Sequence, residues 1–385
     1  MAGYVFLSNS TKPTAAEQNS RENVKLTNVS RPCLKAALDM GYDVYFGTNR
    51  KDPEELECEL PVKMYDSHSY RSLTAFSDNI TAYNNLKKVV EDNHIDVIHC
   101  NTPIGGMVGR LVGKKYHVKK VIYTAHGFHF YEGAPLFNRT VLKWAEQFMA
   151  HWTDAIITMN EEDYQAAKKF KLKKGGKVYK VHGVGIDLKN YADIEVDRLK
   201  KRKELGLNEN DFVCISAGDL VPRKNYDVAI KALAKADNEH IHYLVCGEGP
   251  ERDNLKKLSQ MNGISDRVHF LGFRKDVKEL MKISDLFLFT TLQEGLPRSM
   301  MEAMACGLPC IASKIRGNVD LLDDEKGGYL CECHDDNKIA SKLDLLANNK
   351  GLLKKMGEYN LEAIKKFDIS VVEKEIQDIY AEVLG

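Results

Sequence analysis

Short apolar runs alternate with longer amphipathic segments along the whole chain, and this alternation constrains the fold most. Runs that are apolar on both faces are typical of strands in a parallel sheet covered by helices. Helical patterns lie between them, for example at 84–94, 226–236 and 251–261. The alternation predicts right-handed βαβ units and doubly wound parallel sheets. We expect twelve strands, at 4–8, 43–47, 96–100, 120–125, 155–159, 178–182, 212–218, 242–247, 267–272, 286–291, 309–313 and 327–331.

The chain is long enough for two domains, because 385 residues exceed one ordinary core. The alternation breaks at 183–196, where two glycines follow a strand and a charged segment comes next. We therefore predict an α/β protein with two Rossmann-like domains, 1–185 and 196–365, and a cleft between them. The amphipathic segment 366–385 ends the chain, and the sequence leaves open whether it crosses back onto the first domain. Ligands are expected outside the carboxyl ends of the strands.

Composition excludes several classes of protein. The 55 basic and 55 acidic residues balance, whereas a nucleic-acid-binding protein normally has a basic excess. Nine cysteines are scattered, mostly within apolar runs, which is typical of a reducing cytosol. No run approaches the roughly 18 apolar residues of a membrane span, and the N-terminus lacks signal-peptide features, so we expect a cytoplasmic protein. The "CECH" at 331–334 has no second ligand pair, and no metal site is predicted.

The stretch "TTLQEGLPRSMMEAMACGLPC" (290–310) keeps two glutamates, Glu294 and Glu302, seven residues apart. Pro297 suits the first helical position and Gly307 the position after the helix. Glu294 is then in the loop that leaves a buried strand, and Glu302 is about one turn into the helix. The N–H groups of the first turn between them offer an anion site. The alternative is that both carboxylates only stabilise the helix dipole.

The segment "EGLPRSMMEAMACGLPCIAS" closely resembles the E-x7-E motif of retaining glycosyltransferases of the GT-B fold, family 4. Four more segments, at 217–233, 243–255, 268–277 and 327–343, resemble the family's phosphate segment, G-x-G-P turn, nucleotide-base segment and final strand. They occur in the family's order. In the first half, 95–111 and 121–133 resemble, less closely, acceptor-side segments of bacterial exopolysaccharide and capsule transferases.

The resemblance implies a nucleotide-sugar donor, expected to be UDP-linked, bound in the second half. Glu302 would hold the ribose hydroxyls and Glu294 the hexose. Backbone N–H groups around Pro297 would meet the sugar and the diphosphate. The donor-binding residues implied by the matched segments are Gly218, Arg223, Lys224, Gly247, Phe273, Glu294, Gly295, Leu296, Pro297 and Glu302.

Catalysis is expected to need no protein nucleophile and no metal. Arg223 and Lys224 would stabilise the charge on the departing diphosphate, although an Arg-Lys pair by itself is usually a solvated turn. The resemblance also implies that His126, rather than His129, hydrogen-bonds the donor sugar, while a lone histidine at a strand end is more often structural. Asp219 stands where the family often has arginine, so the phosphate clamp would depend on Arg223 and Lys224.

The predicted function is transfer of a hexose or N-acetylhexosamine to a lipid-linked oligosaccharide in bacterial surface-polysaccharide synthesis, exopolysaccharide or capsule. Two alternatives are a UDP-N-acetylhexosamine 2-epimerase-like enzyme and a catalytically inactive nucleotide-sugar sensor. The basic segments 168–180 and 198–203 suggest either peripheral contact with the cytoplasmic face of the inner membrane or solvated helix faces. The large apolar residues of 142–152 have helical spacing and are predicted to be core.

Overall fold

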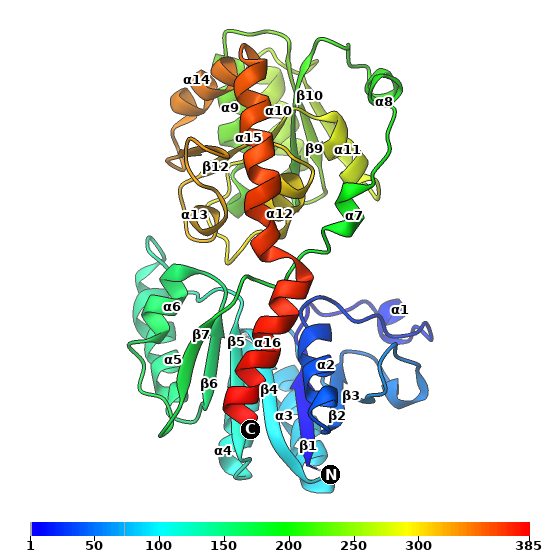
Figure 1. The fold of residues 1–385 in the computed structure, drawn as a ribbon, viewed down its shortest axis with the longest axis vertical. Coiled ribbons are helices and arrows are strands. Elements are labelled where there is room, and N and C mark those ends of the chain that lie inside the picture. The colour runs from blue at the N-terminus through cyan, green and yellow to red at the C-terminus, as the bar shows by residue number, and fades with distance from the viewer. Residues whose placement is uncertain (1, 73) are drawn as a thin grey trace. The chain divides into compact units, whose positions relative to one another are not determined.

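The computed structural model describes residues 2–72 and 74–385. Their contacts divide into two α/β units, Met1–Gly185 with Ile369–Gly385, and Ile186–Asp368. Figure 1 shows the elements of both units in chain order. Each unit contains one parallel sheet with helices on both faces, so the prediction of two Rossmann-like domains is confirmed. The chain passes between the units after Gly185 and again after Asp368.

The first unit has a seven-stranded sheet in the order β3-β2-β1-β4-β5-β6-β7, and its recorded pairings are all parallel. All six strands predicted there are present. The seventh, β3, was missed because it is a short edge strand with partly exposed side chains and no apolar run. The strands are β1 (Gly3–Leu7), β2 (Asp43–Thr48), β3 (Lys63–Asp66), β4 (Ile95–Asn101), β5 (Lys120–Ala125), β6 (Ala155–Thr158) and β7 (Lys177–Lys180).

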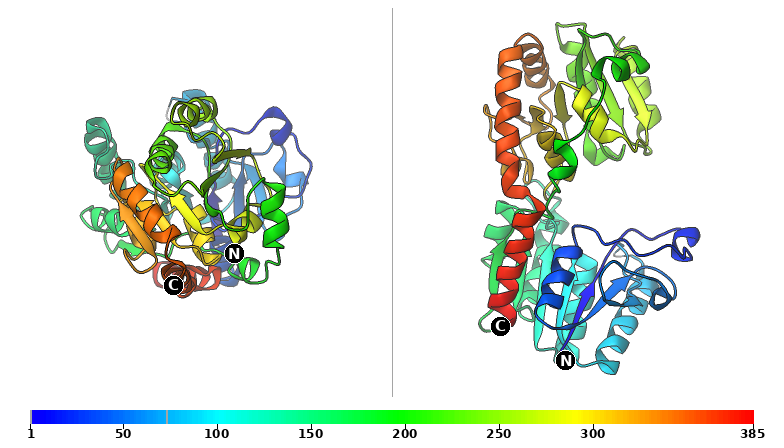
Figure 2. Two further views of the ribbon diagram at one scale, coloured as in Figure 1. Left: turned by 90° about the horizontal axis from the view of Figure 1, so that it is seen from above. Right: turned by 45° about the vertical axis from the view of Figure 1, so that its right-hand side comes forward.

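Helices α3 (Phe76–Asp92) and α4 (Thr102–Lys115) cover one face of this sheet, where Val5 and Leu7 of β1 join the core. The alternate residue Tyr4 points to α16 (Ile369–Leu384), which packs against α2 (Arg31–Asp39), as Figure 2 shows. The hydroxyls of Tyr4 and Tyr380 are 2.6 Å apart, and that of Tyr380 is 2.6 Å from Nδ1 of His99 on β4. Buried hydrogen bonds therefore fasten the last helix of the chain to the first unit.

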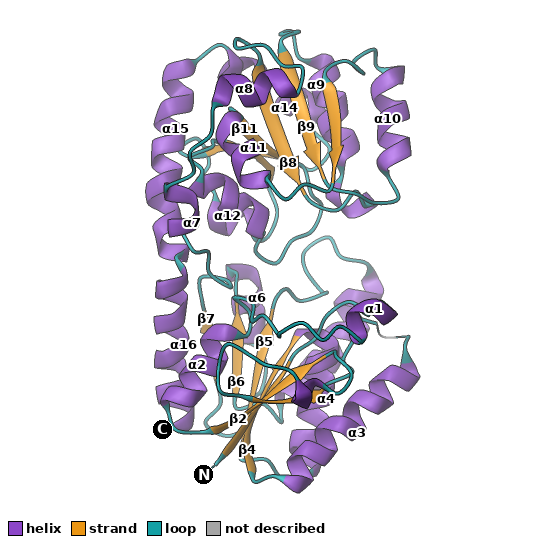
Figure 3. Ribbon diagram, turned by 90° about the vertical axis from the view of Figure 1, so that its right-hand side faces the viewer, coloured by secondary structure: helices purple, strands orange, loops and turns teal. Residues whose placement is uncertain are grey.

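The second unit has a six-stranded sheet in the order β10-β9-β8-β11-β12-β13. Alternate residues of β8 enter two different cores, Cys214 beneath α9 and α14 and Val213 beneath α11 and α12. Figure 3 shows the orange strands enclosed by purple helices. The strands are β8 (Phe212–Ala217), β9 (Ile241–Cys246), β10 (Val268–Gly272), β11 (Leu286–Phe289), β12 (Cys310–Ser313) and β13 (Gly328–Cys331), and the helices named are α9 (Tyr226–Lys235), α11 (Val277–Ile283), α12 (Arg298–Ala305) and α14 (Asp336–Ala347).

The remaining elements connect or cover these sheets. In the part of the chain that is described, every helix is too short or too polar to cross a bilayer. These elements are α1 (Ala15–Gln18), η1 (Pro53–Glu55), η2 (Asn138–Leu142), α5 (Lys143–Ala150), α6 (Glu161–Ala167), α7 (Lys189–Ala192), α8 (Arg198–Glu204), η3 (Pro222–Lys224), α10 (Arg252–Met261), α13 (Asn318–Leu321), α15 (Lys350–Ala363) and η4 (Ile364–Phe367).

Candidate active site

The loops that leave β8, β9 and β10 pack backbone against backbone at the carboxyl edge of the second sheet. The amide of Gly218 donates to the Cys246 carbonyl at 2.9 Å, and that of Gly247 to the Gly272 carbonyl at 2.8 Å. A Cβ on Gly247, whose φ is 143°, would lie 2.0 Å from the Gly218 carbonyl oxygen. Only glycine fits at that position. Gly218 and Gly247, which were predicted to bind the nucleotide-sugar, therefore allow the backbones of these loops to approach closely at this edge of the sheet.

The loop after β8 is locked to the loop after β11. Asn225, in the left-handed region that Asn tolerates, donates from its side chain to the carbonyls of Thr290 (3.0 Å) and Cys333 (2.8 Å). The Leu292 amide donates to the Arg223 carbonyl at 2.8 Å. These bonds fix the distance between the predicted phosphate-binding and sugar-binding segments.

Three donors converge on one oxygen of Glu294. Lys224 Nζ donates to Oε1 at 2.6 Å, Thr291 Oγ1 at 2.9 Å and Arg223 Nη1 at 3.3 Å. The side chains of Lys224 and Glu294 are almost buried, whereas Arg223 is about half exposed. Three of the four predicted catalytic side chains are thus brought together. Two cations face one carboxylate, which leaves a positive excess for an anionic ligand.

The second glutamate of the motif lies on α12. Nε of Arg298 donates to Glu302 Oε1 at 3.0 Å, and the carboxylate of Glu302 is close enough to the hydroxyl of buried Tyr191 to affect its pKa. Burial, followed by the charge of Glu302, raises the pKa of Tyr191, so the hydroxyl stays protonated as a donor. Arg298 therefore orients the carboxylate, with the Tyr191 hydroxyl nearby.

Helix α12 ends where the sequence predicted, but it begins one residue later. Gly307 follows the helix with φ of 78°, as predicted. Pro297 is not the first helical residue, as the sequence suggested, but the cap before it, because its ψ of 116° is extended. The helix therefore begins at Arg298, and the prediction was wrong by one residue.

The loop between Glu294 and α12 carries the predicted residues Gly295 and Leu296. Nε of Arg316 donates to the Glu294 carbonyl at 3.0 Å, and a Cβ on Gly317 would lie 2.6 Å from the Gly295 carbonyl oxygen. The loop is therefore tightly packed from the β12 side. Phe273 follows β10 and is 73% exposed, so its ring is available at the same edge of the sheet.

Asp219, which stands where the family often has arginine, is exposed in the loop directly after Gly218. Among the residues that the structure describes, no group of three or more His, Cys, Asp and Glu side chains is arranged to hold a metal ion.

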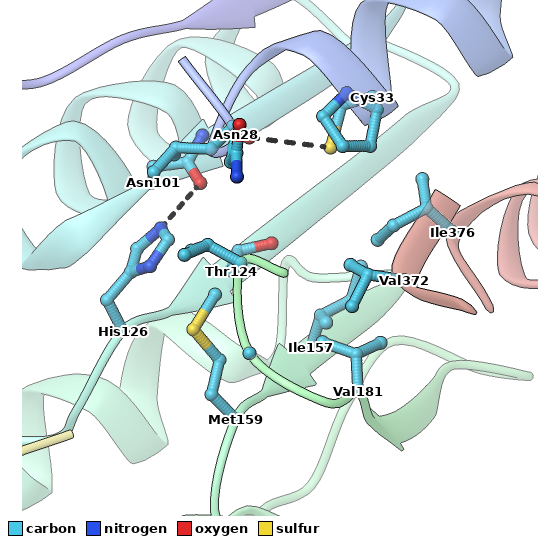
Figure 4. Close-up of a pocket in the computed structure, with 14 residues that line it drawn as sticks. Asn28, Cys33, Asn101, Thr124, His126, Ile157, Met159, Val181, Val372 and Ile376 are labelled. Carbon is cyan, nitrogen blue, oxygen red and sulfur yellow. Dashed lines mark hydrogen bonds between the residues drawn. The ribbon is translucent and has the colours of Figure 1, made fainter. Parts of the chain in front are cut away.

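His126 belongs to the first unit, directly after β5. Its Nε2 is 3.0 Å from Asn101 Oδ1, and burial, followed by the charge of Arg71, lowers its pKa to about 4. The ring is therefore neutral at neutral pH. With Asn101 Oδ1 as acceptor, Nε2 carries the proton and Nδ1 is left as an acceptor. Figure 4 shows His126, Asn101 and Thr124 on the polar side of a pocket whose opposite wall, including Val372 and Ile376 of α16, is apolar.

Several residues that build the site were not identified from the sequence. Asn225, Thr291, Tyr191 and Arg316 act by holding other side chains or loops, and such contacts have no motif. Asn225 alone carried a local signal, because an asparagine just before a helix is a common left-handed residue.

The chain is similar to known glycosyltransferases over most of its length. Residues 33–188 match the family model described as Glycosyltransferase Family 4, and residues 197–363 match Glycosyl transferases group 1. EpsD of Bacillus subtilis (strain 168), named as a glycosyltransferase, is 31% identical over 356 residues, covering 91% of this chain and 92% of that protein. An Escherichia coli protein named UDP-Gal:alpha-D-GlcNAc-diphosphoundecaprenol alpha-1,3-galactosyltransferase is 29% identical over 306 residues, 78% of each chain.

Solved structures show the same fold. Anabaena Alr3699/HepE in complex with UDP and glucose aligns with a TM-score of 0.76 at 20% identity, over 99% of this chain and 100% of that one. WaaG, a glycosyltransferase involved in lipopolysaccharide biosynthesis, aligns with a TM-score of 0.70 at 18% identity, over 98% of this chain and 99% of that one. The chain therefore belongs to the family 4 glycosyltransferases and has the GT-B fold.

Proposed function

We propose that this glycosyltransferase moves a hexose or N-acetylhexosamine from a UDP-sugar to a lipid-linked oligosaccharide, with retention of configuration at the anomeric carbon. The observation that carries the proposal is the convergence of Lys224 and Arg223 on Glu294 at the carboxyl edge of the second sheet. It brings two cations, proposed to bind the diphosphate, within hydrogen-bonding distance of a carboxylate that is proposed to accept from sugar hydroxyls.

The donor is proposed to lie along this edge. Lys224 and Arg223 bind the diphosphate, Glu294 accepts from hexose hydroxyls, and the N–H groups near the start of α12 face the anionic centre. Glu302, oriented by Arg298, accepts from the ribose hydroxyls. Phe273 offers its exposed ring to the base. The presence of UDP in the HepE structure supports a uridine nucleotide.

The reaction breaks the bond between the anomeric carbon and the diphosphate oxygen and forms a bond from that carbon to the acceptor oxygen. The acceptor's proton passes to the departing phosphate oxygen, so no protein base is required. Lys224 and Arg223 stabilise the negative charge that develops on the diphosphate. Neutral His126, with Nδ1 as acceptor, is proposed to hydrogen-bond the transferred sugar.

The acceptor is proposed from the relatives. The name of the Escherichia coli protein describes transfer to a diphosphoundecaprenol-linked sugar, and that of a Campylobacter jejuni relative also describes a diphospho-undecaprenol acceptor. We propose the same acceptor class here, in synthesis of a surface polysaccharide (exopolysaccharide or capsule) at the cytoplasmic face of the membrane. No metal is proposed to take part.

The test is calorimetric binding of UDP and a panel of UDP-sugars to Glu302→Ala, with Glu358→Ala on the exposed surface of α15 as a matched control. We expect Glu302→Ala to lose binding and the control to bind as the unaltered protein does. Unchanged affinity for Glu302→Ala would contradict the ribose assignment.

The same panel separates the reaction classes. Transfer of radiolabelled sugar to an undecaprenyl-diphosphate-linked acceptor is expected, and Lys224→Met should lower kcat by about 10²–10³, the loss typical of one preorganised donor. Conversion of UDP-N-acetylglucosamine without an acceptor would indicate an epimerase instead, and tight UDP binding without turnover would indicate a sensor.

A further inference from the structure

The segment from Pro135 to Trp152 turns large apolar side chains to the solvent. Its residues Phe137, Val141, Trp144 and Phe148, here called the aromatic face, lie at helical spacing along η2 and α5 and are 46–65% exposed. Leu136 beside them is 75% exposed. The prediction that 142–152 packs into the core is therefore wrong for Trp144 and Phe148, whereas Trp152 is partly buried.

A buried ion pair explains this inverted orientation. Glu146 of α5 faces inward, where its Oε2 lies 2.8 Å from Nη1 of fully buried Arg110 on α4. The guanidinium of Arg110 also stacks on the Tyr123 ring, with 4.1 Å from Cζ to the ring centroid. Because the inward position is taken by a paired charge, the opposite side of the helix, which carries the aromatic residues, must face out.

The aromatic face is ordered although it is exposed. The rings of Trp144 and Phe148 stack with centroids 5.6 Å apart, and Phe148 meets Trp152 edge-on at 5.0 Å. Nζ of Lys114, at the end of α4, lies 3.9 Å from the Trp152 ring centroid. With ~150–250 Å² for each full ring, Phe137, Trp144 and Phe148 expose roughly 350 Å² together. A patch of that size is within the range of about 300–600 Å² of the largest apolar patch on a typical monomer, and such a patch is often functional.

Within the segment 133–152 the exposed charges have one sign, whereas Glu132, directly before it, is acidic and also exposed. Between residues 133 and 152 the sequence contains one acidic residue, the inward-facing Glu146. Arg139 and Lys143 are exposed on the same segment, and Lys114 and Lys115 are exposed at the adjoining end of α4. A second copy of this chain would bring Arg139 and Lys143 against their own like charges. An anionic surface is the complementary partner.

The two basic segments singled out in the sequence are less suited to that role. In 198–203, Arg202 is buried and bound to Asp285, Arg198 also binds Asp285, and Lys201 binds Asp276. In 168–180, Lys173, Lys177 and Lys180 form ion pairs with acidic residues of the first unit. Six of the twelve basic residues in these two segments are thus paired within the fold, and neither segment exposes a comparable row of aromatic rings.

We propose that the aromatic face, with Arg139 and Lys143, is the surface by which the first unit docks on an anionic lipid bilayer. The rings of Trp144, Phe148 and Phe137 enter the boundary between headgroups and acyl chains, and the cations bind lipid phosphates. The helix lies in the plane of the interface. This deepens the proposed function, on which it rests for the lipid-linked acceptor, by naming the surface that brings the enzyme to that acceptor.

The experiment is co-sedimentation with vesicles of phosphatidylcholine alone or with phosphatidylglycerol, free of any acceptor. The unaltered protein should sediment with the anionic vesicles and much less with the neutral ones. Trp144→Ser/Phe148→Ser and Arg139→Glu/Lys143→Glu should each bind at least tenfold more weakly, since one basic residue contributes about fivefold. In Trp152→Phe, Trp144 is the one remaining tryptophan, and its emission should shift to the blue on anionic vesicles.

The matched control is Phe76→Ser/Ile80→Ser on α3, which removes two apolar side chains from the same unit that are at least as exposed as those of the test variant. We expect it to bind vesicles normally. UDP affinity should be unchanged in every variant, so a failure of docking is distinguished from a failure of the donor site. Equal loss of vesicle binding in control and test variants would overturn the proposal. So would a concentration-dependent dimer that Trp144→Ser/Phe148→Ser dissociates while vesicle binding persists.

Discussion

Replacing Glu146 by alanine should destabilise the first unit more than any other single change on α5. Arg110 is fully buried and the Glu146 side chain is 9% exposed, with 2.8 Å between the charged atoms. The geometry does not meet that of a hydrogen bond, so the attraction is mainly between the two charges. Removing one partner of a buried pair leaves the other charge uncompensated and costs about 3–5 kcal/mol. Arg110 keeps the Gly106 carbonyl at 2.8 Å and the Tyr123 ring, which places the expected loss near 3 kcal/mol.

Urea unfolding followed by tryptophan fluorescence measures this loss in the relevant unit. Both tryptophans, Trp144 and Trp152, are in the first unit, so their signal follows its unfolding even if the second unit melts separately. With a dependence of about 2 kcal/mol per molar urea, the midpoint of Glu146→Ala should fall by about 1.5 M. The aromatic face should lose its fixed orientation as well, with weaker vesicle binding.

The compensating variant Arg110→Met/Glu146→Leu tests the cause. Because replacing a buried pair by apolar groups of similar volume avoids desolvating two charges, the double variant should recover most of the midpoint. A midpoint shift below about 0.3 M for Glu146→Ala, or a double variant no more stable than the single one, would refute the reasoning.

Two further predictions concern histidine protonation and backbone packing. Burial lowers the pKa of His99 to about 3 and that of His126 to about 4. The unfolded chain therefore binds more protons than the folded chain between pH 6.5 and 4. The first unit should lose stability as the pH falls through that window, by up to about 1.4 kcal/mol per pH unit for each histidine. Equal urea midpoints at pH 7 and pH 5 would contradict this. Gly247→Ala should abolish the thermal stabilisation of the second unit by UDP, because the new Cβ would meet the Gly218 carbonyl oxygen at 2.0 Å. Gly263→Ala, at a positive φ with open space, is its control and should retain the response.

The sequence by itself determined the fold class and the strands. Period and composition are local properties, and a strand buried on both faces must be apolar throughout, so all twelve predicted strands are present. The edge strand β3 was not predicted, because a strand at the edge of a sheet does not require an apolar run. Spacing also determined that Glu302 lies on α12 and Gly307 just after it, since a helix converts sequence distance into a fixed position, and that Glu294 lies in the loop before the helix.

Tertiary structure alone decided what those side chains contact and which way the helices face. Nothing in the local pattern pairs Lys224 with Glu294, or Glu302 with Tyr191, because each pair joins segments far apart in the chain. The same is true of α16, which returns to the first unit through Tyr380. The aromatic residues of α5 have the spacing of a core helix, and only the partner of Glu146, Arg110 on a neighbouring helix, turns them outward. Amphipathic spacing fixes that a helix has two sides, whereas the groups packed against it decide which side is buried.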